Sequence, residues 1–188
     1  MIRIVWGITG SGDRIHEILD IMTNLHEEQN VKITVILSKA AEQVLRGYKL
    51  WELLHSTFDK VLHEQNANAP FIAGSLQIGK YDLLVIAPLT ANSTAKIAHG
   101  IADTLVTNAV AQTLKGTTPV LLYPVDQSLE PIRTIGPDGI EFTIQPRAID
   151  LDNVNRLRNT ERLVIANSPS EIDTEIRVML NSNRGNPR

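Results

Sequence analysis

A glycine-rich segment near the N-terminus has the residue types of a phosphate-binding turn. Thr9-Gly10-Ser11-Gly12 joins an apolar run to a stretch with helical spacing. Backbone N–H groups at such a strand-to-helix turn, together with the helix dipole, favour a phosphate. The segment lacks the Gly-Lys-Ser/Thr of a Walker loop, and Ile15 occupies the third glycine position of a dinucleotide fingerprint. We therefore predict a phosphate-binding turn; the alternative is a tight turn without a ligand.

A second polar segment, residues 88–94, directly follows an apolar run. Its hydrogen-bonding side chains are those of Thr90, Asn92, Ser93 and Thr94. A connecting loop needs only one or two such residues as helix caps. The excess indicates donors directed at a polar ligand, with a multiply capped helix start as the alternative. Ser38 ends another apolar run, where its hydroxyl either contacts the same phosphate or caps the next helix.

The elements that must position these residues alternate between strand and helix. Strands are predicted at the apolar runs 2–8, 31–37, 82–87, 118–123 and 163–166. Several stretches between them carry apolar residues at helical spacing. This order predicts an α/β, doubly wound parallel sheet in a Rossmann-like (flavodoxin-like) three-layer sandwich. Ligands bind at the carboxyl ends of the strands in such a sheet, which is where residues 8–12, 38–41 and 88–94 fall.

Local signals predict a hairpin and the ends of two helices. Ser11 or Asp13 is expected to cap the first helix. Residues 135–140 predict a turn between two short strands. A capping box at residues 168–171 starts a last helix that ends at Leu180. We expect residues 1–180 to form a single domain and residues 181–188 to be a disordered tail.

Composition narrows the possible functions. The 188-residue chain is 43% hydrophobic, enough for a core, and its formal net charge of -3 gives no reason to expect a nucleic acid or a membrane as partner. The absence of cysteine excludes disulfides, iron–sulfur clusters and cysteine nucleophiles. No apolar run approaches the ~20 residues of a membrane span, and no signal peptide is evident. The histidines show no metal-ligand spacing, so we expect a cytoplasmic protein without a metal.

Residues 81–103 resemble a flavoprotein superfamily that includes homo-oligomeric flavin-containing cysteine decarboxylases, flavin prenyltransferases and archaeal-type flavoproteins. Its hallmark is a Pro-x-Ser-Ala-Asn-Thr loop followed by Lys-Ile-Ala-x-Gly-x-x-Asp. The corresponding residues here are Pro88-Leu89-Thr90-Ala91-Asn92-Ser93 and Lys96-Ile97-Ala98-His99-Gly100-Ile101-Ala102-Asp103. The glycine turn and residues 38–41 also match in order, so the resemblance covers about residues 1–125.

The resemblance implies that FMN is the cofactor. The cofactor-binding positions that it implies are Thr9, Gly10, Ser11, Gly12, Ser38, Thr90, Ala91, Asn92, Ser93 and Asn108. The glycine turn and Ser38 would lie near the flavin phosphate, and residues 90–93 would line the ribityl chain and the ring. Members of the superfamily commonly assemble as trimers or as larger shells of trimers, so the resemblance also implies a homo-oligomer.

Departures from the family patterns separate its branches. Gly74 stands where the decarboxylases carry a histidine, and the chain lacks their late Pro-x-Met-Asn segment and their catalytic cysteine, which argues against decarboxylation. Asn108 replaces an arginine of the flavin prenyltransferases, and residues 125–130 depart from their Arg-Glu-Thr-Pro-Leu segment. Prenyl transfer to flavin is therefore kept only as an alternative function.

The archaeal-type flavoproteins and the flavin-dependent dihydromethanopterin reductases resemble this chain at residues 6–12, 108–110, 124–127 and 150–154. This resemblance implies an FMN-dependent oxidoreductase that reduces a dihydropterin, with NAD(P)H or ferredoxin as electron donor. Asp126 would then contact the amino-pyrimidine edge of a pterin, or else be an exposed turn residue. Because the flavin itself carries the hydride chemistry, no catalytic residue is assigned. A further alternative is a non-catalytic carrier that accepts electrons from a ferredoxin.

Overall fold

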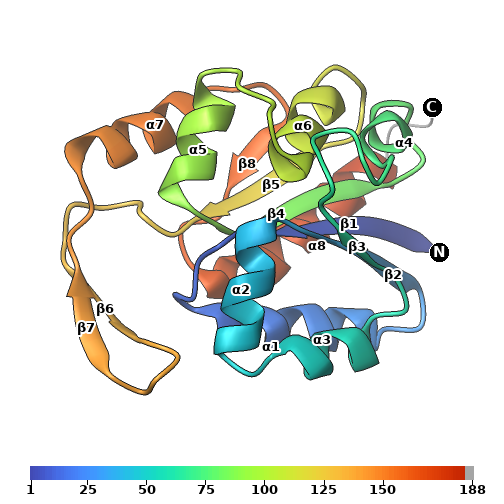
Figure 1. Cartoon of the computed structure of the whole chain (residues 1–188). Helices are drawn as coiled ribbons and strands as arrows, with labels where there is room; N and C mark the ends of the chain where they lie inside the picture. The colour runs from blue at the N-terminus through green and yellow to red at the C-terminus, as the bar shows by residue number, and fades with distance from the viewer. Residues whose placement is uncertain (185–188) are drawn as a thin grey trace.

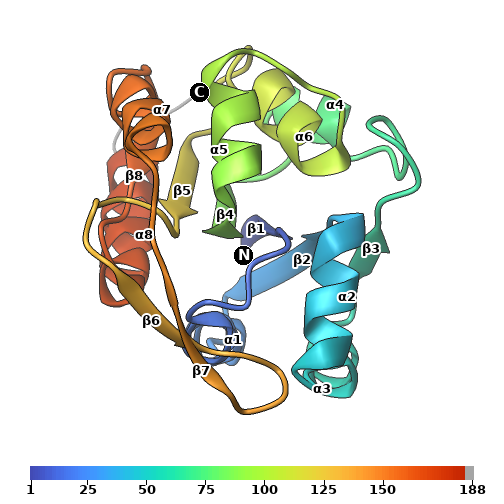
Figure 2. The same ribbon diagram turned by 60° about the vertical axis from the view of Figure 1, so that its left-hand side comes forward.

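Six parallel strands form one sheet with helices on both faces (Figures 1 and 2). In the computed structural model, which describes residues 1–184, the strands in spatial order are β3 (Val61–His63), β2 (Val31–Leu37), β1 (Ile2–Ile8), β4 (Leu83–Leu89), β5 (Val120–Pro124) and β8 (Leu163–Ile165). Every neighbouring pair is parallel. The predicted doubly wound α/β fold is confirmed. The strand order reverses between β1 and β4, and ligands of such sheets bind in the crevice at that point.

The helices form two layers. One face of the sheet is covered by α1 (Ile15–His26), α3 (Trp51–Thr57) and α8 (Pro169–Arg184), with α2 (Lys39–Gly47) beside them. The other face is covered by α4 (Ala73–Gln77), α5 (Ala91–Ala98), α6 (Leu105–Thr113) and α7 (Ala148–Arg158). Successive strand residues point to opposite faces of the sheet: Trp6 packs against the first group of helices, whereas Val5 packs against the second. Burial on both faces explains why these strands read as continuous apolar runs.

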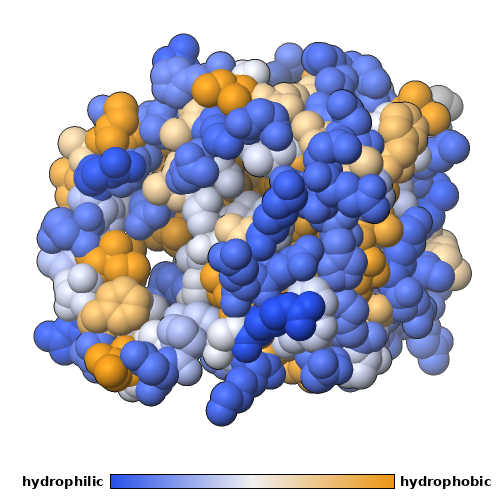
Figure 3. Space-filling model, viewed as in Figure 1, coloured by the Kyte–Doolittle hydropathy of each residue, from blue (hydrophilic) through white to orange (hydrophobic). Residues whose placement is uncertain are grey.

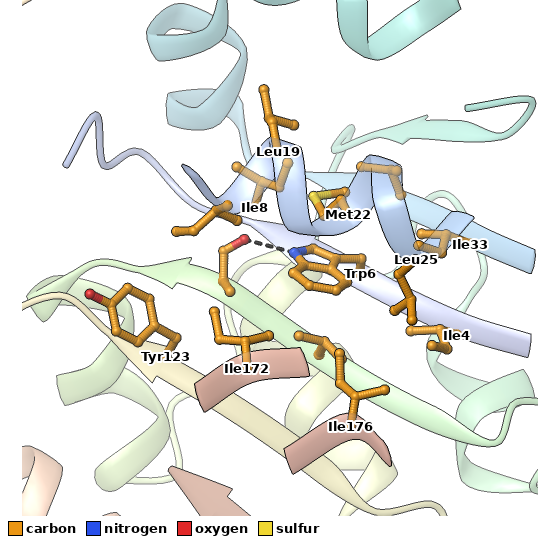
Figure 4. Packing of buried hydrophobic residues seen from close by; sticks show 14 of the residues in the cluster. Ile4, Trp6, Ile8, Leu19, Met22, Leu25, Ile33, Tyr123, Ile172 and Ile176 are labelled. Carbon is orange, nitrogen blue, oxygen red and sulfur yellow. Dashed lines mark hydrogen bonds between the residues drawn. The ribbon is translucent and has the colours of Figure 1, made fainter. Parts of the chain in front are cut away.

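Trp6 lies in the core between β1 and α1 (Figure 4). Its side chain is fully buried in the cluster that also contains Met22, Ile172 and Ile176. The indole Nε1 donates a hydrogen bond of 2.8 Å to the Ala87 carbonyl of β4. The bond satisfies a donor that is buried away from water and ties the two central strands together near their carboxyl ends.

After β5 the chain leaves the sheet and forms an antiparallel hairpin of β6 (Ile132–Ile135) and β7 (Glu141–Ile144). The predicted turn between two short strands at residues 135–140 is confirmed. The hairpin stands beyond the carboxyl ends of the sheet strands (Figure 1). Its side chains at Ile135, Ile140 and Phe142 are exposed, and apolar atoms gather over it in Figure 3.

Two helix ends differ from the prediction. Neither Ser11 nor Asp13 caps α1; the N-cap is Arg14, which has a left-handed φ of 55° and makes no side-chain cap. Helix α8 continues to Arg184, so residues 181–184 are helical and the expectation of a disordered tail was wrong there. The rest of that tail, residues 185–188, lies outside the described residues. Across residues 1–184, the helices are too short or too polar for any of them to cross a bilayer.

Candidate functional site

The loops that follow β1 and β4 are joined by Thr9. Its side chain is buried, and its Oγ1 donates to the Pro88 carbonyl at 2.8 Å and accepts the Thr90 N–H at 2.8 Å. The Thr9 N–H also donates to the Pro88 carbonyl, at 3.1 Å. Leaving a buried polar group without a partner costs about 1–3 kcal/mol, so these paired groups fix the floor of the crevice. The Thr9 hydroxyl thus donates its hydrogen to one protein group and accepts a hydrogen bond from another.

The loop after β2 contacts the carboxyl end of β1, beside the same crevice. The Ser38 N–H donates to the Ile8 carbonyl at 3.1 Å, and the Ser38 hydroxyl accepts the Ala41 N–H at 3.1 Å as the N-cap of α2. An added Cβ on Gly10 would lie 2.5 Å from the Cβ of Ala40. Such a separation is too short for two carbon atoms, so the close approach of the glycine turn to α2 requires glycine.

Backbone N–H groups without an acceptor occur on both of these segments. Within residues 1–184, the N–H groups of Gly10 and Gly12 donate to no acceptor, nor do those of Lys39 and Ala40 at the start of α2. The first N–H groups of a helix have no partner inside the helix, and together with the dipole they bind anions. The two segments therefore carry a donor set that suits a phosphate.

A cavity of about 250 Å³ opens beside this donor set. It is lined by Gly10, Ser11, Asp13, Thr90, Ala91, Asn92, Val125, Asp126, Ile132 and Ile144. Five of the expected cofactor-binding positions and the expected substrate contact Asp126 are thus brought together, although residues 10–11, 90–92 and 126 lie far apart in the sequence.

The other five expected cofactor-binding positions, Asn108 among them, do not line this cavity. Thr9 is buried beneath it, and Gly12 lines an adjoining hollow. Ser38 is the N-cap of α2. The N-cap of α5 is Thr90, whose hydroxyl accepts the Ser93 N–H at 3.3 Å and donates to Ser93 Oγ at 3.2 Å. For Ser38 the structure shows the helix-capping alternative that the sequence left open.

Asn108 lies on α6, away from the cavity. Its side chain is buried, and its Nδ2 donates to the Ala67 carbonyl at 2.8 Å and to Asn68 Oδ1 at 3.1 Å. Its Oδ1 accepts from Gln112 Nε2 at 3.3 Å. Within one chain Asn108 therefore holds the loop at residues 66–69 and does not reach the cavity, contrary to the grouping expected from the resemblance.

Two carboxylates line the cavity. Burial raises the pKa of Asp126, and the nearby charges of Asp150 and Asp13 raise it further, whereas the Ala91 N–H hydrogen bond lowers it in part. Burial likewise raises the pKa of Asp13, against the lowering effect of a hydrogen bond from Thr134. Asp126 is half-buried and lines the cavity; its contact with a pterin stays a prediction.

Sequence reasoning missed four lining residues. The sequence predicts Asp13 as a helix cap, and its place directly after the glycine turn is the one signal that marks it as a lining residue. Val125, Ile132 and Ile144 form an apolar side of the cavity, and the last two come from the hairpin. The hairpin itself was predicted, but its placement over the carboxyl ends of the strands depends on tertiary contacts that no local pattern encodes.

A second hollow of about 690 Å³ adjoins the cavity, because Asp13 lines both. It lies between the start of α1, the end of α2 and the hairpin. Arg14, Lys49 and Arg133 are among its lining residues, together with Glu17. Tyr48 closes one side by donating its hydroxyl to the Ile135 carbonyl at 2.8 Å.

Comparison with known proteins identifies relatives. A family model described as Flavoprotein matches residues 1–183. An uncharacterized protein of Methanocaldococcus jannaschii is 46% identical over 176 residues, which are 94% of this chain and 95% of that protein. A dihydromethanopterin reductase (acceptor) of the same organism is 38% identical over 155 residues, 79% of this chain. The match spans only 59% of that reductase.

A solved structure extends the similarity to the whole fold. Burkholderia xenovorans DmrB in complex with FMN, described as a cubic protein cage for redox transfer, superposes with a TM-score of 0.83 at 34% sequence identity. The superposition covers 97% of this chain and 97% of that one.

Proposed function

The chain belongs to the Flavoprotein family, and from that premise we propose that it is an FMN-dependent oxidoreductase that reduces a dihydropterin of the dihydromethanopterin type. The observation that carries the proposal is the meeting of the glycine turn, the start of α2 and the residue 88–94 loop beside one cavity. Similarity to DmrB and to a dihydromethanopterin reductase supports the cofactor and the acceptor class.

The donor set fits the phosphate of FMN. The unpaired N–H groups of Gly10, Gly12, Lys39 and Ala40 would hold the phosphate, as helix starts and glycine turns do elsewhere. The side chains of Ser11 and Asn92 lie in the adjoining cavity and can hydrogen-bond a sugar-alcohol chain. A mononucleotide suits this arrangement because the third glycine of a dinucleotide fingerprint is absent.

The chain's own residues have positioning roles in this proposal. FMN, when bound, supplies the hydride or electron transfer, while the protein orients it and excludes water. Ala91, Val125 and Ile144 provide the apolar lining. Asp126 is held by the Ala91 N–H, and its remaining lone pairs can accept two hydrogen bonds from an amino-pyrimidine edge. The adjoining hollow offers room for the rest of an acceptor.

A single chain offers an incomplete site. The cavity of about 250 Å³ is smaller than the roughly 300–1,000 Å³ of most cofactor and ligand sites. We propose that neighbouring subunits complete it in a homo-oligomer built from trimers. Exposed apolar residues of the hairpin, such as Ile140 at 64% exposure and Phe142 at 47%, support a contact there, because contiguous exposed apolar side chains mark association surfaces.

The test is a panel of donors and acceptors with the FMN-loaded protein. Anaerobic reduction by NADH, NADPH or reduced ferredoxin, followed by flavin absorbance on addition of dihydromethanopterin, should show reoxidation that saturates with the pterin. Formation of prenylated flavin from reduced FMN and dimethylallyl phosphate would instead support the prenyltransferase alternative. Exchange with ferredoxin alone, without turnover of any pterin, would support the electron-carrier alternative.

A further inference from the structure

We propose that His55 and His63 form a binding site for one divalent transition-metal ion of the Zn²⁺, Ni²⁺ or Cu²⁺ class. The two imidazoles come from α3 and from the edge strand β3, and their Nε2 atoms are 3.3 Å apart. The pair lies on the β3 side of the sheet, and none of its residues lines the cavity described above. The proposal is thus separate from the proposed flavin chemistry.

The hydrogen-bond partners of the other ring nitrogens fix the tautomers. His55 Nδ1 lies 2.9 Å from the Trp51 carbonyl, which can only accept, so this nitrogen carries a hydrogen. His63 Nδ1 lies 3.1 Å from Glu42 Oε1, and an ionised carboxylate also only accepts. When both rings are neutral, the hydrogen of each ring is therefore on Nδ1, and each Nε2 keeps a lone pair for a ligand.

Two lone pairs thus face one another across a short gap. The ring centroids are 5.3 Å apart and the planes 14° from parallel, while the Nε2 atoms are only 3.3 Å apart. The nitrogens therefore lie on the facing edges of the rings. Two acceptors at this distance repel unless a Lewis acid binds between them. The gap calls for a cation or an additional proton.

The distance suits a metal. Two imidazole nitrogens at the usual zinc distance of about 2.0–2.1 Å in tetrahedral geometry stand about 3.4 Å apart. A carboxylate and a backbone carbonyl on the far ring nitrogens are the partners that orient histidine ligands and increase their basicity. Imidazole is a preferred ligand of zinc, copper and nickel.

The site is open enough to load from solvent. The side chains of His63 and Glu42 are 39% and 27% exposed. Within residues 1–184, no group of three or more His, Cys, Asp or Glu is placed to hold a metal, so water would fill the remaining positions. Charged groups near the pair include the Glu42 carboxylate and the Arg46 guanidinium, which stacks 3.6 Å from the centroid of the Trp51 ring.

Trp51 provides a local reporter. Its ring centroid is 4.3 Å from that of His55 and 5.4 Å from that of His63. The chain has two tryptophans, and Trp6 is fully buried in the core. A paramagnetic ion such as Ni²⁺ or Cu²⁺ bound between the histidines should therefore quench Trp51 and leave the Trp6 emission as a constant background.

The experiment titrates the FMN-loaded protein with NiCl2 and follows tryptophan emission, then measures bound zinc after equilibrium dialysis against ZnCl2. The proposal expects saturable quenching and one zinc per chain. His55→Gln and His63→Gln should each weaken binding at least tenfold, and Glu42→Gln should weaken it about tenfold through the loss of an orienting partner. Trp51→Phe should keep the zinc and lose the quenching.

A matched control is His99→Gln, which removes an exposed histidine whose Nε2 contacts Asn153 Oδ1 at 3.1 Å on another face of the molecule. It should bind zinc and nickel like the wild type. Circular dichroism of each variant checks that the fold is kept. The proposal fails if the wild type shows no saturable quenching and no bound zinc. The short distance between the Nε2 atoms would then be explained by a proton that the two nitrogens share. It also fails if the His55 and His63 variants bind as much metal as the control.

Discussion

The cavity has one wall that belongs to the sheet and another that belongs to the hairpin, and the two are held differently. On the sheet side, the Thr9 hydroxyl donates to the Pro88 carbonyl in a buried hydrogen bond of 2.8 Å and accepts the Thr90 N–H at 2.8 Å, and Gly10 packs directly on Ala40. On the hairpin side, the Tyr48 hydroxyl makes a solvent-exposed bond to a backbone carbonyl. Buried polar groups lose more when unpaired than exposed ones do, so the sheet wall is the rigid one.

The difference matches two tasks. A cofactor that stays bound gains from a wall that is already in its final geometry, because little ordering has to accompany binding. An acceptor that enters and leaves, or a neighbouring subunit, is better served by a wall that can adjust. Substitutions in the sheet wall should therefore act on FMN affinity, and substitutions in the hairpin wall on the acceptor.

The largest effect is expected for Gly10→Ala. The new Cβ would lie 2.5 Å from the Ala40 Cβ, and overpacking of this kind costs about 1–3 kcal/mol. The turn would move away from α2, and FMN affinity should fall by about 10- to 100-fold, since each 1.4 kcal/mol is tenfold. Flavin fluorescence titration measures the change.

The double variant Gly10→Ala with Ala40→Gly sharpens this prediction. Without the Ala40 Cβ, the next atom to the new methyl group is the Ala40 carbonyl carbon at 3.3 Å. FMN affinity should return most of the way to that of the wild type. If the double variant binds FMN as weakly as Gly10→Ala alone, the contact with the Ala40 Cβ is not the cause of the lost affinity.

A smaller effect is expected for Thr9→Val, which keeps the shape and removes the hydroxyl. The Thr90 N–H and the Pro88 carbonyl each lose a partner, and unfolding free energy should fall by about 1–3 kcal/mol. Urea denaturation measures it. Thr9→Ser keeps the hydroxyl and should lose less than half as much; equal losses would assign the effect to the methyl group instead.

Tyr48→Phe tests the hairpin wall. Because the lost hydrogen bond is exposed, stability should change by less than about 1 kcal/mol and FMN affinity should be unchanged. The KM for the acceptor should rise a few-fold in steady-state assays. A large loss of FMN with an unchanged KM would reverse the roles given to the two walls.

The smallest effect concerns Asp126 and pH. Burial raises the pKa of this carboxyl above its unfolded value of 3.8, so the folded state holds the proton more tightly, and the charged form disfavours folding at neutral pH. Asp126→Asn should therefore be slightly more stable than the wild type near pH 7. The advantage should shrink as pH falls through the raised pKa toward 3.8, as urea denaturation at several pH values would record. An advantage that grew on acidification would contradict the raised pKa.

Sequence reasoning reached the sheet wall because its signals are local. Continuous apolar strands, a glycine turn and a polar loop each have a recognisable local sequence pattern. In a parallel sheet the carboxyl ends of the strands lie at one edge, so the loops that follow them are predicted to lie together. It did not reach the hairpin wall, because Ile132 and Ile144 gain their place only through tertiary contacts. Within one chain Asn108 lies outside the cavity, because its amide hydrogen-bonds Ala67 and Asn68, 41 and 40 residues away, and no motif can show that contact.

A paired titration of the wild type with FMN and riboflavin tests whether backbone donors of the glycine turn and of α2 hold the phosphate of a flavin mononucleotide. Charge-assisted hydrogen bonds are worth about 1.5–3 kcal/mol each, so FMN should saturate one site per chain with an affinity at least about 100-fold above that of riboflavin. Equal affinities for the two flavins, or no binding of either, would contradict the account.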